Sequence, residues 1–273
     1  MVDYCNSKGT EAESLYDLNL STKGGPADLC TQLDVENEAM IVRGIHQSFP
    51  THAIIGEESS SSNGTIPAVS SETNTWIIDP IDGTTNFASG IPLTCVSIAM
   101  CDAATRRPVL GVIYAPMTRE LYMAIKGCGS FRNGQRISSV PKLPVPLEQA
   151  VVCCEFGYSR DTESITKMVQ AVQRILQHGC RAIRQVGSGC LDLCYVATGR
   201  LDVVYSGVAS EGWKPWDYAA GLVICEEAGC IMESLDKSTA AESPNFDLYS
   251  KSVICAKSRA LLEQCRNIVT NQH

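Results

Sequence analysis

The stretch Trp76-Ile-Ile-Asp-Pro-Ile-Asp-Gly-Thr-Thr-Asn-Phe87 decides the fold of this chain. Its apolar first residues stop at two carboxylates, Asp79 and Asp82, and Gly83 follows directly. The pattern predicts a buried strand that ends at the acids and turns into a helix. Carboxylates are hard oxygen ligands for divalent cations, and the free backbone N–H groups at a helix start bind phosphate. The stretch therefore predicts a metal and phosphate site where the strand ends.

Two further acids stand at comparable positions elsewhere in the chain. Glu57 follows the apolar residues 53–55, which predict a short strand, and Asp217 lies at the start of a helix predicted over 216–228. Because each acid lies beside a strand end or a helix start, all four carboxylates can converge on rigid backbone. Mg²⁺ is usually held by a few carboxylates, several waters and a substrate phosphate. An isolated Asp-x-x-Asp is usually a solvated turn, so it is the surrounding sequence that favours a metal site.

The turn between the paired acids offers further groups. Pro80 restricts the residue before it to an extended backbone, which makes the carbonyl of Ile81 an additional candidate ligand. Gly83 allows close backbone approach, and the N–H groups of Gly83 and Thr84 are placed to bind a phosphate. Alternatively, Thr84 and Thr85 simply cap the helix, and the two roles can coexist.

The chemistry that these residues predict is metal-assisted hydrolysis of a phosphate ester. Hydrolysis needs an activated water, neutralised phosphate charge and a stabilised leaving alkoxide, and two closely spaced cations meet all three needs. No covalent route is indicated, because the histidines lie outside any nucleophile motif and the cysteines lack a partner arrangement for thiolate catalysis. The histidines are His46, His52, His178 and His273.

Composition argues against several other classes of protein. Of the 273 residues, 44% are hydrophobic and 19% charged, as in an ordinary globular protein, and the formal charge of −8 argues against nucleic acid or an anionic membrane surface as partner. No stretch approaches the length of a membrane span and the N-terminus carries no signal pattern, which predicts a cytoplasmic protein. The 14 cysteines show no zinc or disulfide spacing, so we expect buried reduced thiols. Those inside apolar stretches are Cys95, Cys101, Cys153, Cys154, Cys225 and Cys255.

Predicted strands and helices alternate along the chain, which indicates a layered α/β fold. Residues 1–26 are polar and turn-rich and are expected to form a weakly structured segment, whereas 27–273 form one catalytic domain whose halves meet near 141–150. Strands are expected at 95–100, 109–114, 121–125, 151–154, 182–185, 202–205 and 253–256, and helices at 161–177, 187–198, 216–228 and from 258.

Three local predictions concern the first half. A helix is expected to begin at Asp34, and the segment 59–75, rich in Ser, Asn and Thr, is expected to be a surface loop. Asn133-Gly134 predicts a two-residue hairpin. The apolar residues on one face of the first helix are Val35, Ala39, Val42, Ile45 and Phe49.

The segments 56–58, 76–87 and 215–221, in that order, resemble the signature of the inositol monophosphatase family. Residues 26–34 also resemble its Pro-x-Asp-Leu-Val-Thr-x-x-Asp segment, and the likeness extends from about residue 23 to about residue 269. The resemblance implies an αβαβα sandwich of the inositol monophosphatase and fructose-1,6-bisphosphatase type, a homodimer, Mg²⁺ as cofactor and inhibition by Li⁺. Because the family begins with a long helix that the N-terminal residues do not resemble, that helix is expected to be missing or divergent.

The resemblance also assigns roles to individual residues. The metal ligands are expected to be Glu57, Asp79, Asp82 and Asp217 with the carbonyl of Ile81. The catalytic residues are expected to be Thr84 and Asp34, as the family's water-activating pair, together with Glu57. Substrate contacts are expected at Asp82, Gly83, Thr84, Gly187, Ser188, Gly189, Glu211 and Asp217.

The chain departs from the family pattern at two places near the substrate. The segment between Asp202 and Asp217 is longer than in animal members, so the family's inositol-contacting Glu aligns near Ser206 and Glu211 is its candidate substitute. In addition, Gly189 stands where the family has Ala, in the first turn of a predicted helix.

Three functional hypotheses follow. The first is Mg²⁺-dependent hydrolysis of myo-inositol monophosphate to myo-inositol and phosphate. The second keeps the reaction and changes the substrate to another sugar phosphate or a bisphosphate, such as fructose 1,6-bisphosphate or adenosine 3′,5′-bisphosphate. The third is a non-catalytic relative that binds phosphate or a partner protein. The presence of both Thr84 and Asp34 argues against the third, since binding alone needs no water-activating pair.

Overall fold

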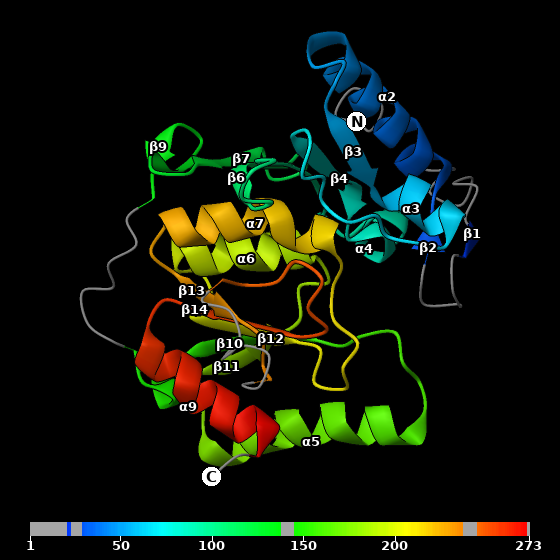
Figure 1. Cartoon of the computed structure of the whole chain (residues 1–273). Helices are drawn as coiled ribbons and strands as arrows, with labels where there is room; N and C mark the ends of the chain where they lie inside the picture. The colour runs from blue at the N-terminus through cyan, green and yellow to red at the C-terminus, as the bar shows by residue number, and fades with distance from the viewer. Residues whose placement is uncertain (1–20, 23–28, 138–144, 237–244, 272–273) are drawn as a thin grey trace.

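Two β-sheets alternate with layers of helices in this protein, as the computed structural model shows (Figure 1). The structure describes residues 21–22, 29–137, 145–236 and 245–271. The predictions for residues 1–26 and for the first helix lie outside these ranges, apart from β1 (Ser21–Thr22), which pairs with β2 (Leu29–Cys30). The layered α/β architecture predicted from the sequence is confirmed.

The first sheet has seven strands in the order β3-β4-β5-β6-β7-β8-β9. β3 and β4 are parallel and every later neighbour is antiparallel, so the sheet is a meander after its first crossover. The predicted Asn133-Gly134 turn joins β8 to β9, with positive φ at both residues, as a type I′ hairpin requires. The strands are β3 (Ala53–Gly56), β4 (Thr75–Asp82), β5 (Cys95–Cys101), β6 (Pro108–Ala115), β7 (Glu120–Ile125), β8 (Gly129–Arg132) and β9 (Gln135–Arg136).

The second sheet has five strands in the order β11-β10-β12-β14-β13. β10 pairs in parallel with both β11 and β12, whereas β14 is antiparallel to both of its neighbours. β13 was not predicted from the sequence. The strands are β10 (Val151–Glu155), β11 (Ala182–Arg184), β12 (Val203–Ser206), β13 (Ile231–Glu233) and β14 (Val253–Ala256).

Helices cover both outer faces and fill the space between the sheets (Figure 1). α6 (Gly189–Thr198) and α7 (Pro215–Glu227) lie side by side between the sheets and are buried almost all round. α5 (Thr162–His178) and α9 (Arg259–Thr270) cover the second sheet, and α2 (Gln32–Ser48) packs on β4 of the first. The short elements are α3 (Glu57–Asn63), α4 (Thr84–Ala88) and the 3₁₀ turn η2 (Leu147–Gln149).

Two predictions for the first half were wrong in part. Residues 59–63 of the predicted loop 59–75 are helical and belong to α3, because the carboxylate of Glu38 accepts the N–H groups of Glu58 (2.8 Å) and Ser59 (3.0 Å) and so caps that helix from α2. On α2 the predicted apolar stripe is buried only in part. Ile45 is buried, but Val35 is 52% exposed, and the buried face also carries Asp34 and Glu38.

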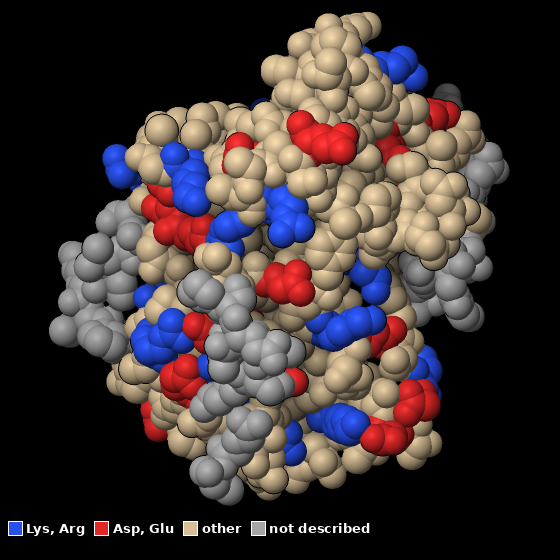
Figure 2. All heavy atoms as spheres, in the orientation of Figure 1, with Lys and Arg blue, Asp and Glu red and all other residues tan. Residues whose placement is uncertain are grey.

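Most of the described cysteines are buried and reduced, as predicted, and the surface carries charges of both signs. The described cysteines from Cys95 to Cys265 are all free, and most of them, including the six that lie in apolar stretches, are buried. On the face drawn in Figure 2, basic and acidic side chains are interspersed. Across the described residues, no helix has both the length and the apolar character needed to cross a membrane.

Candidate active site

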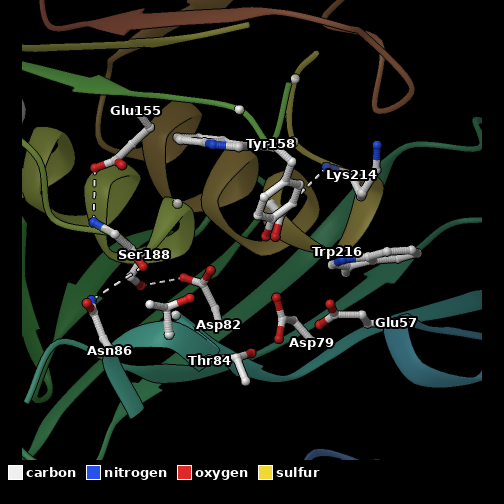
Figure 3. Close-up of a pocket in the computed structure, with 18 of the residues that line it drawn as sticks. Glu57, Asp79, Asp82, Thr84, Asn86, Glu155, Tyr158, Ser188, Lys214 and Trp216 are labelled. Atoms are coloured by element: carbon white, nitrogen blue, oxygen red, sulfur yellow. Dashed lines mark hydrogen bonds between the residues drawn. The ribbon is translucent and has the colours of Figure 1, made fainter. Parts of the chain in front are cut away.

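A pocket of about 430 Å³ opens where β3 and β4 end and where α4, α6 and α7 begin (Figure 3). All of the predicted metal ligands and substrate contacts line it. Of the predicted catalytic residues only Asp34 does not, because it lies behind Thr84. Residues from both halves of the chain therefore form a single cavity.

The acids of the central motif meet a third one from the second half of the chain. Asp79, Asp82 and Asp217 each present a carboxylate oxygen within 4.8 Å of the others, and Figure 3 shows Glu57 beside Asp79. Asp79 and Asp82 can share the pocket because β4 pairs with β5 through a bulge between them, where Pro80 needs no ladder hydrogen bond. In a regular strand, residues three apart would face opposite sides.

The acids are buried against one another, so their negative charge needs compensation. Burial raises the pKa of Asp79 well above its usual value, and the charges of Glu57 and Asp82 raise it further. The pKa of Asp217 is raised well above its usual value in the same way, by burial and then by Asp82 and Glu57. A cation placed among these oxygens would remove the repulsion, and the all-oxygen donor set suits a hard divalent ion. The residues present therefore fit a metal.

Asp82 is oriented by donors from α6 and β5. Its Oδ2 accepts the hydroxyl of Ser188, the N–H of Cys190 (2.9 Å) and the thiol of Cys95 (3.6 Å). Three donors on one oxygen fix the rotation of the carboxylate. Ser188, predicted as a substrate contact, thus acts in this structure as a partner of Asp82 as well.

Thr84 and Asp34, 50 residues apart, lie in contact. The hydroxyl of Thr84 lies 3.3 Å from Oδ1 of Asp34 and 3.0 Å from the carbonyl oxygen of Ile81. Asp34 is fully buried in the first turn of α2, where its carboxylate also accepts the N–H of Thr31 (2.8 Å). A threonine hydroxyl that donates to a buried carboxylate keeps its oxygen free to accept a proton from water.

The helix start after the acids is formed as the sequence predicted. Gly83 has φ of +85° and is the N-cap of α4, and a Cβ there would come within 3.1 Å of the carbonyl oxygen of Gly187. No side chain caps this helix, so the alternative in which Thr84 and Thr85 serve as caps is not what the structure shows. The first N–H groups of α4 border the pocket.

Two residues that sequence reasoning missed hold the loop before α6. The side-chain amide of Asn86 donates to the carbonyl of Val186 (2.7 Å), and Oε1 of Glu155 accepts the N–H groups of Val186 (2.7 Å) and Gly187 (3.0 Å). Figure 3 shows Glu155 above the loop and Asn86 below it. The available signal for Glu155 was an acid directly after the apolar strand 151–154, the same pattern that marks Asp79.

A second buried acid lies behind this loop. Asp192 is fully buried in α6, its Oδ1 accepts the thiol of Cys153 (3.1 Å), and an oxygen of its carboxylate lies within 4.8 Å of one of Glu155. Burial raises the pKa of Asp192 well above its usual value, and the charge of Glu155 raises it further. Oδ2 of Asp192 is buried without a hydrogen-bond partner, which favours the protonated, neutral form of this acid over the charged form.

On the opposite side of the pocket, Glu211 lines the cavity, as a substrate contact must. Its Oε2 accepts the N–H of Ser159, so this carboxylate also joins the long 207–214 segment to the loop after β10. Ser206 is fully buried and donates to the carbonyl of Glu155 (3.2 Å), away from the pocket. The indole of Trp213 packs against the start of α6. A Cβ at residue 189 would come within 3.0 Å of the indole, so Gly189, which has no side chain, makes room for Trp213.

A layered fold with a pocket in which buried carboxylates converge beside a helix start defines a phosphatase of the metal-dependent class. The model of the inositol monophosphatase family matches residues 6–273, beyond both ends of the range that the motifs indicated. The chain belongs to the inositol monophosphatase family and is a phosphatase.

Individual relatives agree with this assignment. Inositol monophosphatase 1 of Sus scrofa is 34% identical over 91% of this chain and 84% of its own length. Inositol monophosphatase 2 of Solanum lycopersicum is 39% identical over 84% of this chain and 81% of its own. Among solved structures, the extragenic suppressor protein suhB of Bartonella henselae has a TM-score of 0.80 at 27% identity, covering 100% of this chain and 96% of that one. The Thermotoga maritima IMPase has a TM-score of 0.75 at 31% identity, covering 93% and 87%.

Proposed function

We propose that this protein hydrolyses myo-inositol monophosphate to myo-inositol and phosphate in the presence of Mg²⁺. The observation that carries the proposal is the contact between Thr84 and Asp34 beside three converging carboxylates. A site that only bound phosphate would need the acids and a cation, but it would have no use for a hydroxyl paired with a buried acceptor. The names of the relatives support inositol monophosphate as substrate.

Glu57, Asp79, Asp82, Asp217 and the carbonyl of Ile81 would hold the metal. When bound, Mg²⁺ supplies Lewis acidity that lowers the pKa of a water and neutralises phosphate charge. Thr84 accepts a proton from the attacking water while it passes its own hydroxyl proton toward Oδ1 of Asp34, since both groups lie within hydrogen-bond reach. The N–H groups of Gly83 and Thr84 bind the phosphate at the start of α4.

The second half of the chain binds the alcohol part of the substrate. Gly187, Ser188 and Gly189 approach from the start of α6, and Glu155 keeps their loop in place. Asp217, which lines the pocket, would contact both the metal and the alcohol of the substrate. We further propose that the protein is a cytoplasmic homodimer and that Li⁺ inhibits it by competing for one cation position.

The test is phosphate release across a substrate panel, with and without Mg²⁺ and Li⁺. The panel contains inositol 1-phosphate, fructose 1,6-bisphosphate and adenosine 3′,5′-bisphosphate. We expect Mg²⁺-dependent, Li⁺-sensitive turnover of inositol 1-phosphate. A higher kcat/KM for a bisphosphate would overturn the assignment of inositol monophosphate as substrate, but not the assignment of metal-dependent hydrolysis. Metal-independent turnover would overturn the chemistry.

A further inference from the structure

The side of the pocket away from the paired acids carries two aromatic rings. We define the aromatic wall as Tyr158 and Trp213, which line the pocket from the loop after β10 and from the 207–214 segment. Tyr158 is 56% exposed, and Figure 3 shows its ring pointing into the pocket toward the side that carries Asp79 and Asp82. An exposed tyrosine ring above an active site is a surface on which a flat group can stack.

Trp213 is held rigidly in this wall. One side of its indole lies against Gly189, and its ring packs on that of Tyr218 with centroids 5.7 Å apart. Tyr218 in turn packs edge-on against Phe246 at 4.9 Å. A large side chain that is fixed before binding loses little conformational entropy when a ligand packs on it.

Two polar groups of this region are engaged within the protein. Oε2 of Glu211 is bound to the Ser159 N–H, and the Ser206 hydroxyl is bound to the Glu155 carbonyl. One oxygen of the Glu211 carboxylate is thus occupied, and the same 207–214 segment brings the indole of Trp213 to the pocket. Ring faces favour flat or apolar groups, whereas the hydroxyl groups of a polyol need polar partners.

We propose that Trp213 and Tyr158 select phosphate monoesters whose alcohol carries a planar ring, such as nucleoside monophosphates, as substrates in addition to inositol phosphate. The inference rests on the proposed phosphatase function and assigns its specificity to this wall. The pocket, at about 430 Å³, has room for such a molecule, because pockets for ligands of this size measure about 300–1,000 Å³.

The experiment compares adenosine 5′-monophosphate with ribose 5-phosphate. In both, the phosphate leaves from the primary 5′-oxygen of a ribose, and the nucleotide carries adenine where the sugar phosphate has its anomeric hydroxyl. For the wild type we expect kcat/KM to be higher for the nucleotide by about tenfold, the size of one base stacking on an aromatic side chain. In Trp213→Leu the ratio falls toward one, mainly through the KM of the nucleotide. The matched control is Trp76→Leu, since Trp76 packs against Phe49 and His52 outside the pocket and its loss leaves the ratio unchanged.

A double-mutant cycle tests the contact itself. In Gly189→Ala the new Cβ displaces the indole, so the ratio falls as in Trp213→Leu, and Gly189→Ala/Trp213→Leu gives no further fall in the ratio. A ratio near one in the wild type, or equal ratios in the wild type and Trp213→Leu, would overturn the inference while inositol 1-phosphate turnover still upheld the proposed function. Absence of all Mg²⁺-dependent turnover in the folded wild type would instead overturn the proposed function, and the inference with it.

Discussion

The two sides of the pocket are held in place in different ways. The acidic wall, by which we mean Glu57, Asp79, Asp82 and Asp217, lies at strand ends and helix starts, where buried backbone fixes each carboxylate. The aromatic wall lies on two connecting segments that are fixed by a few long-range contacts. We infer that residues on rigid secondary structure perform the hydrolysis, whereas residues on the connecting segments select the alcohol of the substrate.

If this division is correct, the largest effect comes from Asp82→Asn. The substitution removes one charge among the converging acids while keeping the size of the side chain, and we expect kcat to fall by about 10³-fold or more, near the upper end for loss of one electrostatic group. The fall should be equal for nucleotide and sugar phosphates, because in the proposed function Asp82 acts at the metal and phosphate end of the substrate. Phosphate release measured against Mg²⁺ concentration checks this, with a thermal melt as the folding control. Retained Mg²⁺-dependent turnover in Asp82→Asn would contradict the assignment of the chemistry to the acidic wall.

Thr84→Ala should have the next largest effect. Without the hydroxyl no group passes the proton of the water to Asp34, and we expect kcat to fall by about 10²-fold, the lower end of the range for general acid–base catalysis. Thr84→Ser keeps the hydroxyl and is the matched control, and it should recover most of the activity. Steady-state kinetics on inositol 1-phosphate separates the outcomes, since a change in KM alone would assign Thr84 to binding rather than to chemistry.

The same division explains how much of the site the sequence could predict. The acids were found because their positions are set locally, by a strand that ends, a proline that allows a bulge and a glycine that starts a helix. The long-range contacts that hold the neighbouring helix and loop were missed, since Glu38 caps α3 from 20 residues away and Asn86 reaches Val186 across 100 residues. Chain spacing carries no signal for such contacts.

The substrate side shows the limit most clearly. In the sequence, Glu211 and Gly189 are two separate departures from the family. In the structure both belong to one rearrangement, in which the 207–214 segment ties down its own carboxylate and places Trp213 over the missing side chain. Only the packing of α6 against that segment connects them.

The smallest effect concerns Asp192, which lies beside Glu155 behind the loop between the two walls. Because burial and the charge of Glu155 raise its pKa in the folded protein, the folded state holds a proton that the unfolded chain releases above its ordinary pKa of about 3.9. The stability of the wild type must therefore fall as the pH rises from about 4 through the raised pKa. Asp192→Asn removes this titration and keeps the acceptor for the Cys153 thiol.

We expect Asp192→Asn to be more stable than the wild type at neutral pH by about 1 kcal/mol, the order of one unsatisfied buried polar group, which corresponds to about 2 °C in Tm for a chain of this size. The gain should shrink toward pH 4, and kcat should change less than twofold. Thermal melts of both proteins at a series of pH values between 4 and 8 provide the measurement. Two parallel Tm curves would mean that Asp192 does not carry the extra proton. A large loss of kcat would mean that Asp192 contributes to catalysis. In that case α6 would have to be counted with the acidic wall.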